Sequence, residues 1–192
     1  MFIFLKTHLG SSWIIDGENH HDPIFASVTG VSGDEQEIIA MTKLCAADLI
    51  SKGISQWDEN YPDLNTIQTD IHQGELFKYV IDDTILGIVV LNENQDPEYN
   101  ELNWITSNNS RNLFVHRLAV HPEHQGKGIA RQLMDFAEEK AKRDGYDSIR
   151  LDTFSQNKRN QRFYDNRGYQ RTGEVYLSYR DDFPYIGYEL IL

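Results

Sequence analysis

The spacing of apolar residues along the chain switches several times between a helical and an alternating period, and these switches outline the predicted elements. An apolar, strand-like segment at residues 24–31 comes first. Apolar residues then recur every three or four positions over residues 38–50, which predicts a helix capped by Asp34 and ending near Gly53. A shorter helical pattern over residues 64–71 predicts a second helix.

Two apolar runs in the middle of the chain predict a β-hairpin. They span residues 76–81 and 85–91 and flank a polar turn at residues 82–84. The polar stretch at residues 92–111 predicts a long loop, with a helical turn around residues 99–104. Loops of that length commonly shape a site or are mobile, so this one is a candidate for substrate contacts.

A strand, a helix and a second strand follow in close succession, at residues 112–120, 128–142 and 148–153. Such a β-α-β unit predicts parallel pairing of its strands and a right-handed crossover. The spacing in the helix predicts that five residues face inward: Ile129, Leu133, Phe136, Ala137 and Ala141.

The C-terminal part predicts one more helix and two closing strands. The helix covers residues 158–167 and stops at Gly168, a residue suited to the left-handed position after a helix. The strands cover residues 174–179 and 186–192 and are joined by a turn at residues 181–184. Alternating strands and helices are typical of an α/β fold.

The length of 192 residues fits one domain, expected at residues 23–192, behind an N-terminal extension of residues 1–22 with no assigned role. The apolar start of the chain is broken by Lys6 and is too short for a signal segment or a membrane span. The single cysteine, Cys45, excludes an internal disulfide, and we expect a cytoplasmic protein.

The charge of the chain narrows the range of partners. Thirty acidic residues against 18 basic ones give a formal net charge of -12, which repels nucleic acid and anionic membranes. We therefore expect neither as a partner. The same charge suits a cationic acceptor, although an acidic surface also serves solubility alone.

A glycine-rich turn leads from the predicted strand into the predicted helix, between His121 and Ala130. Gly126 and Gly128 have no Cβ, so an anion can approach the backbone closely. The start of a helix presents unpaired N–H groups and the positive end of the helix dipole, which together favour a phosphate or pyrophosphate. A Gly-x-Gly sequence also occurs in ordinary turns, so the surrounding sequence has to decide.

Two other phosphate-binding motifs fit this turn less well. A Rossmann motif places its glycines directly after the strand and a third glycine at the position of Arg131, whereas five residues, 121–125, intervene here. Asp152 does lie at a suitable sequence distance for the ribose contact of that motif. A Walker loop is excluded because Lys127 is followed by Gly128 instead of Ser or Thr.

The turn and the strand before it resemble motif A of the GNAT superfamily of N-acetyltransferases. The end of the strand reads Arg117-Leu118-Ala119-Val120-His121-Pro122. Residues 125–130 satisfy the family pattern Gln/Arg-x-x-Gly-x-Gly/Ala. By this resemblance the cosubstrate is acetyl-CoA, and the glycine turn holds its pyrophosphate.

Further signatures of the family follow in the same order. The family has an Asn after the next strand, a Tyr seven positions later and then a Gly-aromatic pair, and Asn157, Tyr164 and residues 168–169 match. Asn160 departs from the small Ala common there, which affects packing rather than binding. The elements agree in order with the family over residues 24–192.

The resemblance implies a GNAT fold, with a mixed central β-sheet of about six to seven strands flanked by about four helices. It also implies that main-chain groups of the strand pair with the pantetheine arm, that Asn157 bonds the arm, and that Tyr164 protonates the leaving thiolate. Arg159 belongs to a group of basic residues gathered near the phosphates, with Lys127, Arg131, Lys158 and Arg162. The expected cofactor-binding residues are Leu118, Ala119, Val120, Gln125, Gly126, Lys127, Gly128, Ile129, Ala130, Asn157, Arg159 and Tyr164.

The catalytic acid is better indicated than the base. Tyrosine has an unperturbed pKa of roughly 10 and can donate a proton at neutral pH, although Tyr164 also reads as an aromatic packed beside Phe163. His116, Glu101 and Glu123 are candidates for the base, and the sequence does not choose among them. No metal is expected, because the histidines lack a helical i, i+4 pair with accompanying carboxylates.

We therefore expect an N-acetyltransferase that transfers the acetyl group of acetyl-CoA to a primary amine by direct attack on the thioester. The acceptor is a small-molecule amine or, alternatively, an amine of a protein. A second alternative is an acyl-CoA sensor of the same fold without turnover. Five aromatic residues form either an acceptor wall or part of the core: Trp57, Tyr61, Trp104, Phe183 and Tyr185. Many relatives pair across the closing strands, which makes a homodimer an expectation from the resemblance alone.

Overall fold

The computed structural model describes residues 4–6, 13–15, 24–27, 33–107, 109–178 and 180–192. Within the predicted N-terminal extension, β1 (Phe4–Lys6) and β2 (Trp13–Ile15) pair antiparallel. The predicted first strand is observed as β3 (Ile24–Ser27), and its predicted continuation at residues 28–31 also lies outside them.

The main sheet follows the order β3-β4-β5-β6-β7-β9-β8. In the described residues it has seven strands and is accompanied by four α-helices, as predicted. The chain forms two compact units, an N-terminal unit of Met1–Leu91 with Arg117–Asp135, and a C-terminal unit of Asn92–His116 with Phe136–Leu192. Both β6 (Asn112–Val120) and α3 (Ile129–Arg143) contribute residues to each unit.

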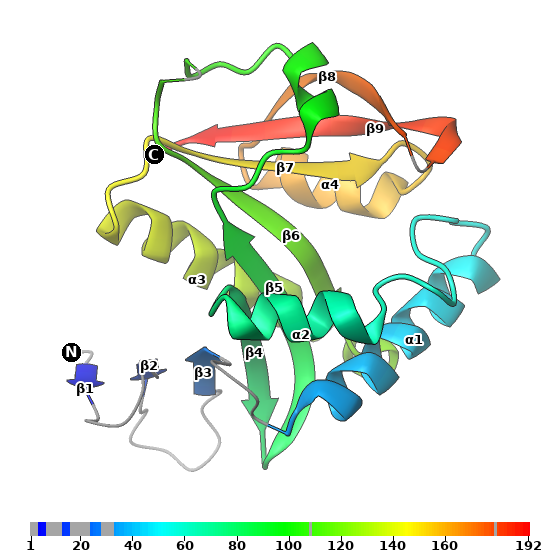
Figure 1. The fold of residues 1–192 in the computed structure, drawn as a ribbon, viewed down its shortest axis with the longest axis vertical. Coiled ribbons are helices and arrows are strands. Elements are labelled where there is room, and N and C mark those ends of the chain that lie inside the picture. The colour runs from blue at the N-terminus through cyan, green and yellow to red at the C-terminus, as the bar shows by residue number, and fades with distance from the viewer. Residues whose placement is uncertain (1–3, 7–12, 16–23, 28–32, 108, 179) are drawn as a thin grey trace. The chain divides into compact units, whose positions relative to one another are not determined.

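The N-terminal unit contains the predicted hairpin, β4 (Leu76–Ile81) and β5 (Thr84–Asn92), paired antiparallel. Its two turn residues, Asp82 and Asp83, both have positive φ, which matches the twist of a two-residue hairpin loop. The helices α1 (Glu35–Ser51) and α2 (Leu64–His72) pack against each other, and α2 also contacts β4 (Figure 1).

The start of α1 departs from the predicted cap. Asp34 occupies the N-cap position, but its side chain makes no capping bond and instead accepts a hydrogen bond and ion pair from Lys78 Nζ. Along α1, Leu44 and Ile50 are exposed, and Thr42 and Ala46 are buried with Ile38, Met41 and Cys45. The inward face of α1 is therefore narrower than the number of apolar residues in the helix suggests.

Close packing in the N-terminal unit depends on Gly87 in β5. A Cβ at this position would lie 2.9 Å from the Ala119 carbonyl oxygen, 3.0 Å from Leu133 Cδ1 and 3.2 Å from Ile129 Cγ2. Real Cβ atoms almost never come so close to a backbone oxygen. The missing side chain therefore lets β5 lie directly against β6 and the first turn of α3.

The predicted inward face of α3 is confirmed with one exchange. Ile129, Leu133, Ala137 and Ala141 are buried as expected, and so is Met134. Phe136 is only half-buried. Both residues adjoin the predicted apolar stripe on opposite sides, and a period of 3.6 does not distinguish which side is covered.

The C-terminal unit contains the parallel pair predicted from the β-α-β pattern. The first three residues of β6, Asn112 to Phe114, pair with Ser148 to Arg150 at the start of β7 (Ser148–Phe154), and the pairing ends there. The predicted C-terminal helix is observed as α4 (Lys158–Asn166), followed by Gly168 with φ of 85°.

The closing strands are longer than predicted. They are β8 (Gln170–Leu177) and β9 (Arg180–Ile191), and Leu177 pairs with Arg180. The predicted turn at residues 181–184 is therefore wrong, because these residues lie inside β9. A register shift between Val175 and Leu177 accommodates them as extra residues opposite a single residue of β8, so the break in pattern is a bulge.

A buried ion pair holds the loop at residues 92–111, which contains the 3₁₀ helix η1 (Pro97–Glu101). Arg150 Nε on β7 donates to Glu189 Oε1 on β9 at 2.9 Å, and both side chains are almost completely buried. The same carboxylate accepts hydrogen bonds from the hydroxyls of Ser148 and Thr106 and from the Ile105 amide. In Figure 1 the loop with η1 lies beside β8, which η1 contacts.

Candidate functional site

The predicted anion-binding turn is built at the end of β6 in the N-terminal unit. A short 3₁₀ helix, η2 (Pro122–His124), leads to Gln125, and α3 begins at Ile129. Gly126 and Gly128 have φ of 80° and 90°, in the left-handed region that glycine adopts without strain. The chain can therefore double back just before the helix, as the sequence predicts.

The start of α3 offers backbone donors and open space. The Gln132 amide donates to the Gly128 carbonyl in the first turn, so the amides of Ile129 and Ala130 come before the first intrahelical bond. A Cβ built on Gly126 would meet nothing within 4 Å, and one on Gly128 would meet only Arg131 Nη2, at 3.2 Å. Helical amides, a positive dipole end and a guanidinium beside the turn are together suited to a pyrophosphate.

The main chain of β6 presents Leu118 and Val120 away from β5. The His121 amide donates to the Leu86 carbonyl of β5 at 2.9 Å, and successive strand residues direct their backbone groups to opposite edges. The Val120 carbonyl already accepts from Cys45 Sγ at 3.3 Å and from Gln125 Nε2 at 3.5 Å. The Gln125 side chain thus ties the turn to β6, a positioning role that the motif did not predict.

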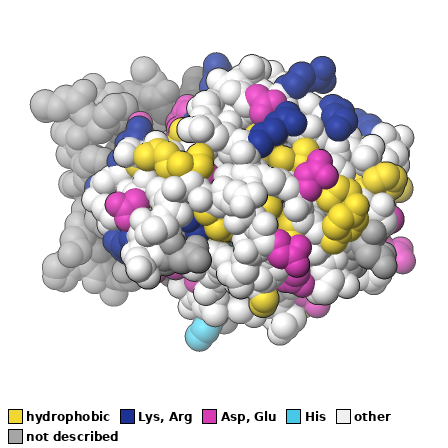
Figure 2. Space-filling model, turned by 90° about the horizontal axis from the view of Figure 1, so that it is seen from above, with side chains coloured by type: hydrophobic (Ala, Val, Ile, Leu, Met, Phe, Trp, Pro, Cys, Tyr) yellow, Lys and Arg dark blue, Asp and Glu magenta, His cyan; other side chains and the backbone are white. Residues whose placement is uncertain are grey.

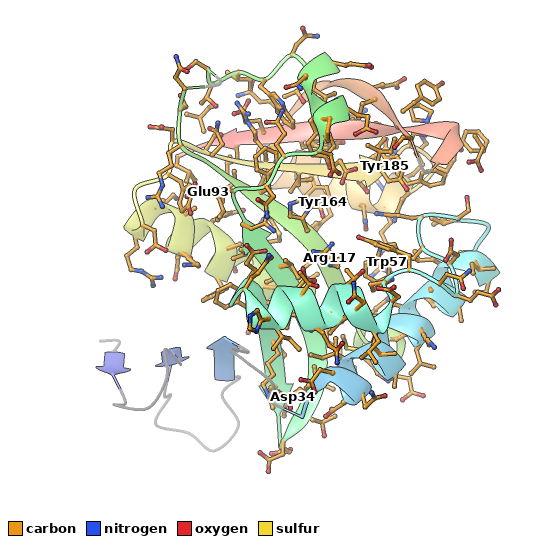
Figure 3. The ribbon with its side chains drawn as sticks, in the orientation of Figure 1. Asp34, Trp57, Glu93, Arg117, Tyr164 and Tyr185 are labelled. Carbon is orange, nitrogen blue, oxygen red and sulfur yellow. The ribbon has the colours of Figure 1, made fainter. Side chains whose placement is uncertain are left out.

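Arg117 distorts β6 just before this segment. It is a non-glycine residue with φ of 47°, and its guanidinium donates to both Asp70 oxygens at 2.7 and 2.6 Å and to the Tyr61 hydroxyl at 3.0 Å. Figure 3 labels Arg117 close to α2, the helix that carries Asp70. Burial raises the pKa of Asp70, although the Arg117 charge and hydrogen bonds oppose this. The buried Arg117–Asp70 ion pair holds β6 against α2 and so fixes the path of the strand just before the proposed site.

In the C-terminal unit, Asn157 begins α4. Its side-chain oxygen accepts a hydrogen bond from the Asn160 amide at 3.1 Å, and the residue is buried. This N-cap orients α4 and with it Tyr164. Asn157 therefore has a structural role whether or not it contacts a cosubstrate. Asn160 takes part in this cap through its backbone amide.

Tyr164 is buried among other tyrosines. Its ring lies 5.8 Å from that of Tyr169 and 5.6 Å from that of Tyr188. Burial raises the pKa of Tyr164 well above its usual value, and the charges of Asp152 and Tyr188 raise it further. The phenol consequently keeps its proton at neutral pH. The residue is thus a packed aromatic, and its role as the acid stays a prediction.

Asp152 is a titratable residue near Tyr164 that sequence reasoning considered only for a ribose contact. It lies on β7, two positions beyond the last residue paired with β6. Burial raises its pKa to about 7, the nearby Asp96 charge acts in the same direction, and a hydrogen bond with Tyr99 opposes them. Its carboxylate in the middle of a short strand, between Leu151 and Thr153, was the available signal.

The three base candidates from the sequence lie in different surroundings. His116 on β6 stacks on Phe114, with ring centroids 6.2 Å apart. Glu101 is exposed at the end of η1, and Glu123 is exposed in η2. Arg159 is exposed in the first turn of α4. His116 is the one of these side chains that shares a strand with the proposed pantetheine edge.

The five aromatic residues of the expected acceptor wall divide between core and surface. Trp57 is buried in the core of the N-terminal unit, and Tyr185 is buried against Phe154 at 5.3 Å. Trp104 is half-buried under the Arg150 guanidinium. Tyr61 and Phe183 are exposed, so these two are open to a ligand. Figure 2 shows that apolar side chains at the surface lie among charged ones.

Two other features bear on the kind of site, within the part of the chain that the structure describes. That part holds no group of three His, Cys, Asp or Glu side chains arranged to bind a metal ion. None of its helices has both the length and the apolar character needed to cross a membrane.

Comparison with known proteins decides the family. The model of the Acetyltransferase (GNAT) family matches residues 40–169, more than half of the chain. The chain belongs to the GNAT family. The matched GNAT segment contains the glycine turn of the N-terminal unit and both Asn157 and Tyr164 of the C-terminal unit.

Individual acetyltransferases resemble most of the chain at low identity. The uncharacterized N-acetyltransferase YesJ of Bacillus subtilis (strain 168) is 25% identical over 161 residues, covering 83% of this chain and 88% of YesJ. A GNAT-family acetyltransferase from Streptococcus agalactiae 2603 has a TM-score of 0.74 at 23% identity, covering 85% of this chain and 93% of its own. PaiA N-acetyltransferase from Thermoplasma acidophilum has a TM-score of 0.64 at 18% identity, with coverage of 89% and 99%. The solved structures confirm the predicted GNAT fold.

Proposed function

We propose that this GNAT protein transfers the acetyl group of acetyl-CoA to a primary amine. The observation that carries the proposal is the turn before α3, where two left-handed glycines, helical amides and open space come together. A diphosphate satisfies such a turn better than water does, because the donors are fixed before the anion arrives. The structure of PaiA N-acetyltransferase contains coenzyme A, which supports the same cosubstrate class here.

The proposed binding roles follow the residues of the two units. In the N-terminal unit, amides from Gln125 to Ala130 hold the pyrophosphate, with Lys127 and Arg131 beside them. Backbone groups of Leu118 and Val120 pair with the pantetheine arm. The Val120 carbonyl already accepts two hydrogen bonds, so we assign its contribution to the N–H. Asn157 of the C-terminal unit bonds the pantetheine arm. It also contributes indirectly, because it caps the helix that carries Tyr164.

The proposed chemistry is direct attack of a neutral amine on the thioester carbonyl. The carbon–sulfur bond breaks as the new amide forms, and the departing thiolate accepts a proton from Tyr164. A phenol whose pKa is raised by burial is a weak acid against water, but a thiolate leaving into the same low-dielectric surroundings is also poorly solvated. The shared surroundings would raise the pKa of both groups, which limits the cost of proton transfer between them. The net charge of -12 favours a cationic acceptor.

The test combines cosubstrate binding with turnover. Calorimetry with CoA and acetyl-CoA measures binding, and a panel of primary amines with acetyl-CoA is followed by release of free thiol. We expect turnover with at least one amine, and about 10²-fold loss of kcat in Tyr164→Phe with CoA affinity unchanged. Tyr176 is an exposed tyrosine of β8, so Tyr176→Phe serves as the matched control and should leave kcat unchanged.

Two outcomes would contradict the proposal. CoA that fails to bind at millimolar concentration would remove the cosubstrate. If CoA binds but neither the wild type nor Tyr164→Phe acetylates any amine, the result would favour the acyl-CoA sensor instead.

A further inference from the structure

The C-terminal unit contains a cavity of about 550 Å³ that is separate from the proposed cosubstrate residues. It is lined by the loop at residues 92–111 and by residues near the start of β6 and β7, all of which belong to this unit. No residue with a proposed role in acetyl transfer is among them. The volume falls within the range of about 300–1,000 Å³ that small-molecule sites have. The cavity is therefore large enough for a ligand of its own.

A buried arginine forms the base of the cavity. Arg150 and Phe114 are the buried residues of the lining. The Nε and Nη2 atoms of Arg150 donate to Glu189 and to Thr106, whereas Nη1 makes no hydrogen bond with the described residues. The guanidinium lies over the Trp104 ring, 4.6 Å from its centroid, which holds its plane. A donor in this position gains a hydrogen bond when a ligand oxygen occupies the space in front of it.

The rim of the cavity carries carboxylates and carboxamides. Glu93, which directly follows β5, is labelled in Figure 3 and is exposed. Its Oε1 accepts from the Tyr146 hydroxyl at 2.8 Å and from Arg111 Nη2 at 3.0 Å, and these bonds lower the pKa of Glu93. Its Oε2 makes no hydrogen bond within the described part of the chain. The other polar rim residues include Asp96, Asn100 and Asn109.

The walls of the cavity are held in place before any ligand arrives. The Thr106 carbonyl accepts from Arg150 Nη2 at 2.9 Å, and the Thr106 hydroxyl donates to Glu189. The side-chain oxygen of Asn112, another lining residue, accepts from the Ser148 hydroxyl at 2.8 Å. These bonds tie the loop to β6, β7 and β9. A ligand therefore meets a preformed site and has little ordering of the loop to offset.

The charges around the cavity disfavour several classes of ligand. Two guanidinium groups stand against three carboxylates, which gives a local formal charge of -1: Arg111 and Arg150 against Glu93, Asp96 and Glu189. A phosphate or another net anion would add to this excess. A purely apolar ligand would cover the polar lining without replacing its hydrogen bonds to water. A ligand that brings a positive group to the rim and an oxygen to the base avoids both costs.

We propose that this cavity binds a small zwitterion of the amino-acid type, at a site distinct from the acetyl-CoA site. The carboxylate of the ligand accepts from Arg150 Nη1 at the base, and its ammonium group lies toward Glu93 and Asp96 at the rim. The carboxamides of Asn100 and Asn109 are placed to bond a polar side chain. Charge-assisted hydrogen bonds at both ends fix the orientation of the ligand. Binding requires no acetyl transfer.

The first test is calorimetric titration of the full-length protein with each of the twenty standard amino acids. We expect at least one to bind with a millimolar or lower Kd, and to bind also when CoA is present at saturation. Two analogues of that amino acid probe the two ends: the amine without the carboxylate, and the N-acetyl derivative without the ammonium group. Each should bind at least about ten-fold more weakly, because each loses one charge-assisted contact.

The location of the bound amino acid can be read from Trp104, whose ring lies against Arg150. Its indole N–H resonance in an NMR spectrum is identified as the one missing from Trp104→Phe. We expect this resonance to shift during the titration, to an extent that follows the calorimetric Kd.

Two variants test the rim without changing the buried Arg150. Glu93→Gln and Asp96→Asn each remove one negative charge and keep the shape of the side chain. We expect each to raise the Kd of the amino acid about five-fold and to leave that of its N-acetyl derivative unchanged. Glu139→Gln replaces an exposed carboxylate of α3 outside the lining, so it is the matched control and should alter neither Kd.

Three outcomes would overturn the proposal. They are a failure of all twenty amino acids to bind at millimolar concentration, binding that leaves the Trp104 resonance in place, and an affinity that neither rim variant weakens. Because the measured quantity is binding, a protein that acetylates no amine would contradict the proposed function and leave this site standing.

Discussion

At the scale of single residues, glycines define the proposed pyrophosphate turn because they have no side chain. Gly126 combines a left-handed φ with an empty surrounding, so its lack of a side chain serves the backbone path and the approach of a ligand together. Gly145, after α3, has a φ of 76° and an equally open surrounding but lies outside the turn. The two positions make a matched pair for separating strain from binding.

Replacing Gly126 by Ala should weaken CoA binding, whereas Gly145→Ala should not. Both substitutions place a Cβ at positive φ and should cost about 1 kcal/mol in the free energy of unfolding. The Cβ at position 126 additionally occupies the path of an anion toward the amides, so we expect at least a ten-fold higher Kd for CoA by calorimetry. Equal CoA affinity in the two variants would place the diphosphate elsewhere.

The residues predicted from the sequence and those found only in the structure differ in what determines them. Gly126, Gly128 and Tyr164 follow from local spacing and family pattern, and the fold puts them on the expected turn and helix. Asp152 was considered only for a ribose contact, because the groups that act on it, Tyr99 and Asp96, lie more than 50 positions earlier in the chain. A shifted pKa depends on neighbours in space, and spacing along one strand does not supply them.

At the scale of elements, periodicity predicted the helices and most strands, since most residues of their apolar faces are buried. It failed at β9, where Asp181, Asp182 and Pro184 read as a turn and the structure accommodates them in a bulge. Turn-forming residues do not distinguish a loop from an irregular strand edge. The long loop at residues 92–111 was recognised, but its anchor was not, because Glu189 lies far away in the sequence.

The Glu189 anchor should be measurable by substitution. Glu189→Gln leaves Arg150 buried without its charged partner and should lower the free energy of unfolding by about 3 kcal/mol at pH 7 in urea titrations. Glu174→Gln, on the exposed side of β8, is the control and should change it by less than about 0.5 kcal/mol.

The same variant has a predicted pH dependence. Burial opposes the charge on Glu189, but hydrogen bonds from Thr106, Ser148 and Arg150 outweigh it and lower its pKa. A carboxyl group with a lowered pKa stabilises the fold above its unfolded-state pKa of about 4.3, and this stabilisation is lost as the pH falls through the folded-state value. The gap between wild type and Glu189→Gln should therefore narrow below about pH 4.3; a constant gap would contradict it.

At the scale of the whole molecule, the chain contains a single thiol, in the core of the N-terminal unit. Burial raises the pKa of Cys45 to about 12, with Asp48 adding to the effect, and the thiol donates to the Val120 carbonyl. The expectation that Cys45 is not a nucleophile agrees with this setting, since the thiolate is the reactive form.

Labelling of Cys45 should report unfolding of that core. In native buffer we expect a disulfide reagent such as Ellman's to react many orders of magnitude more slowly than with a free thiol, because both access and ionisation are suppressed. In a urea series, the labelling rate should rise together with the loss of tryptophan fluorescence. Rapid labelling without urea would show that α1 opens independently of its core.

The clearance at Gly87 has a consequence for how freely the protein can diverge. Because Gly87 has no Cβ, β5 can lie close to the start of α3, and this distance helps to determine where the glycine turn lies. In a library randomised at this codon and screened for soluble protein, only the native amino acid should survive. Mutational tolerance near the turn is thus limited by a position in β5, outside the turn itself.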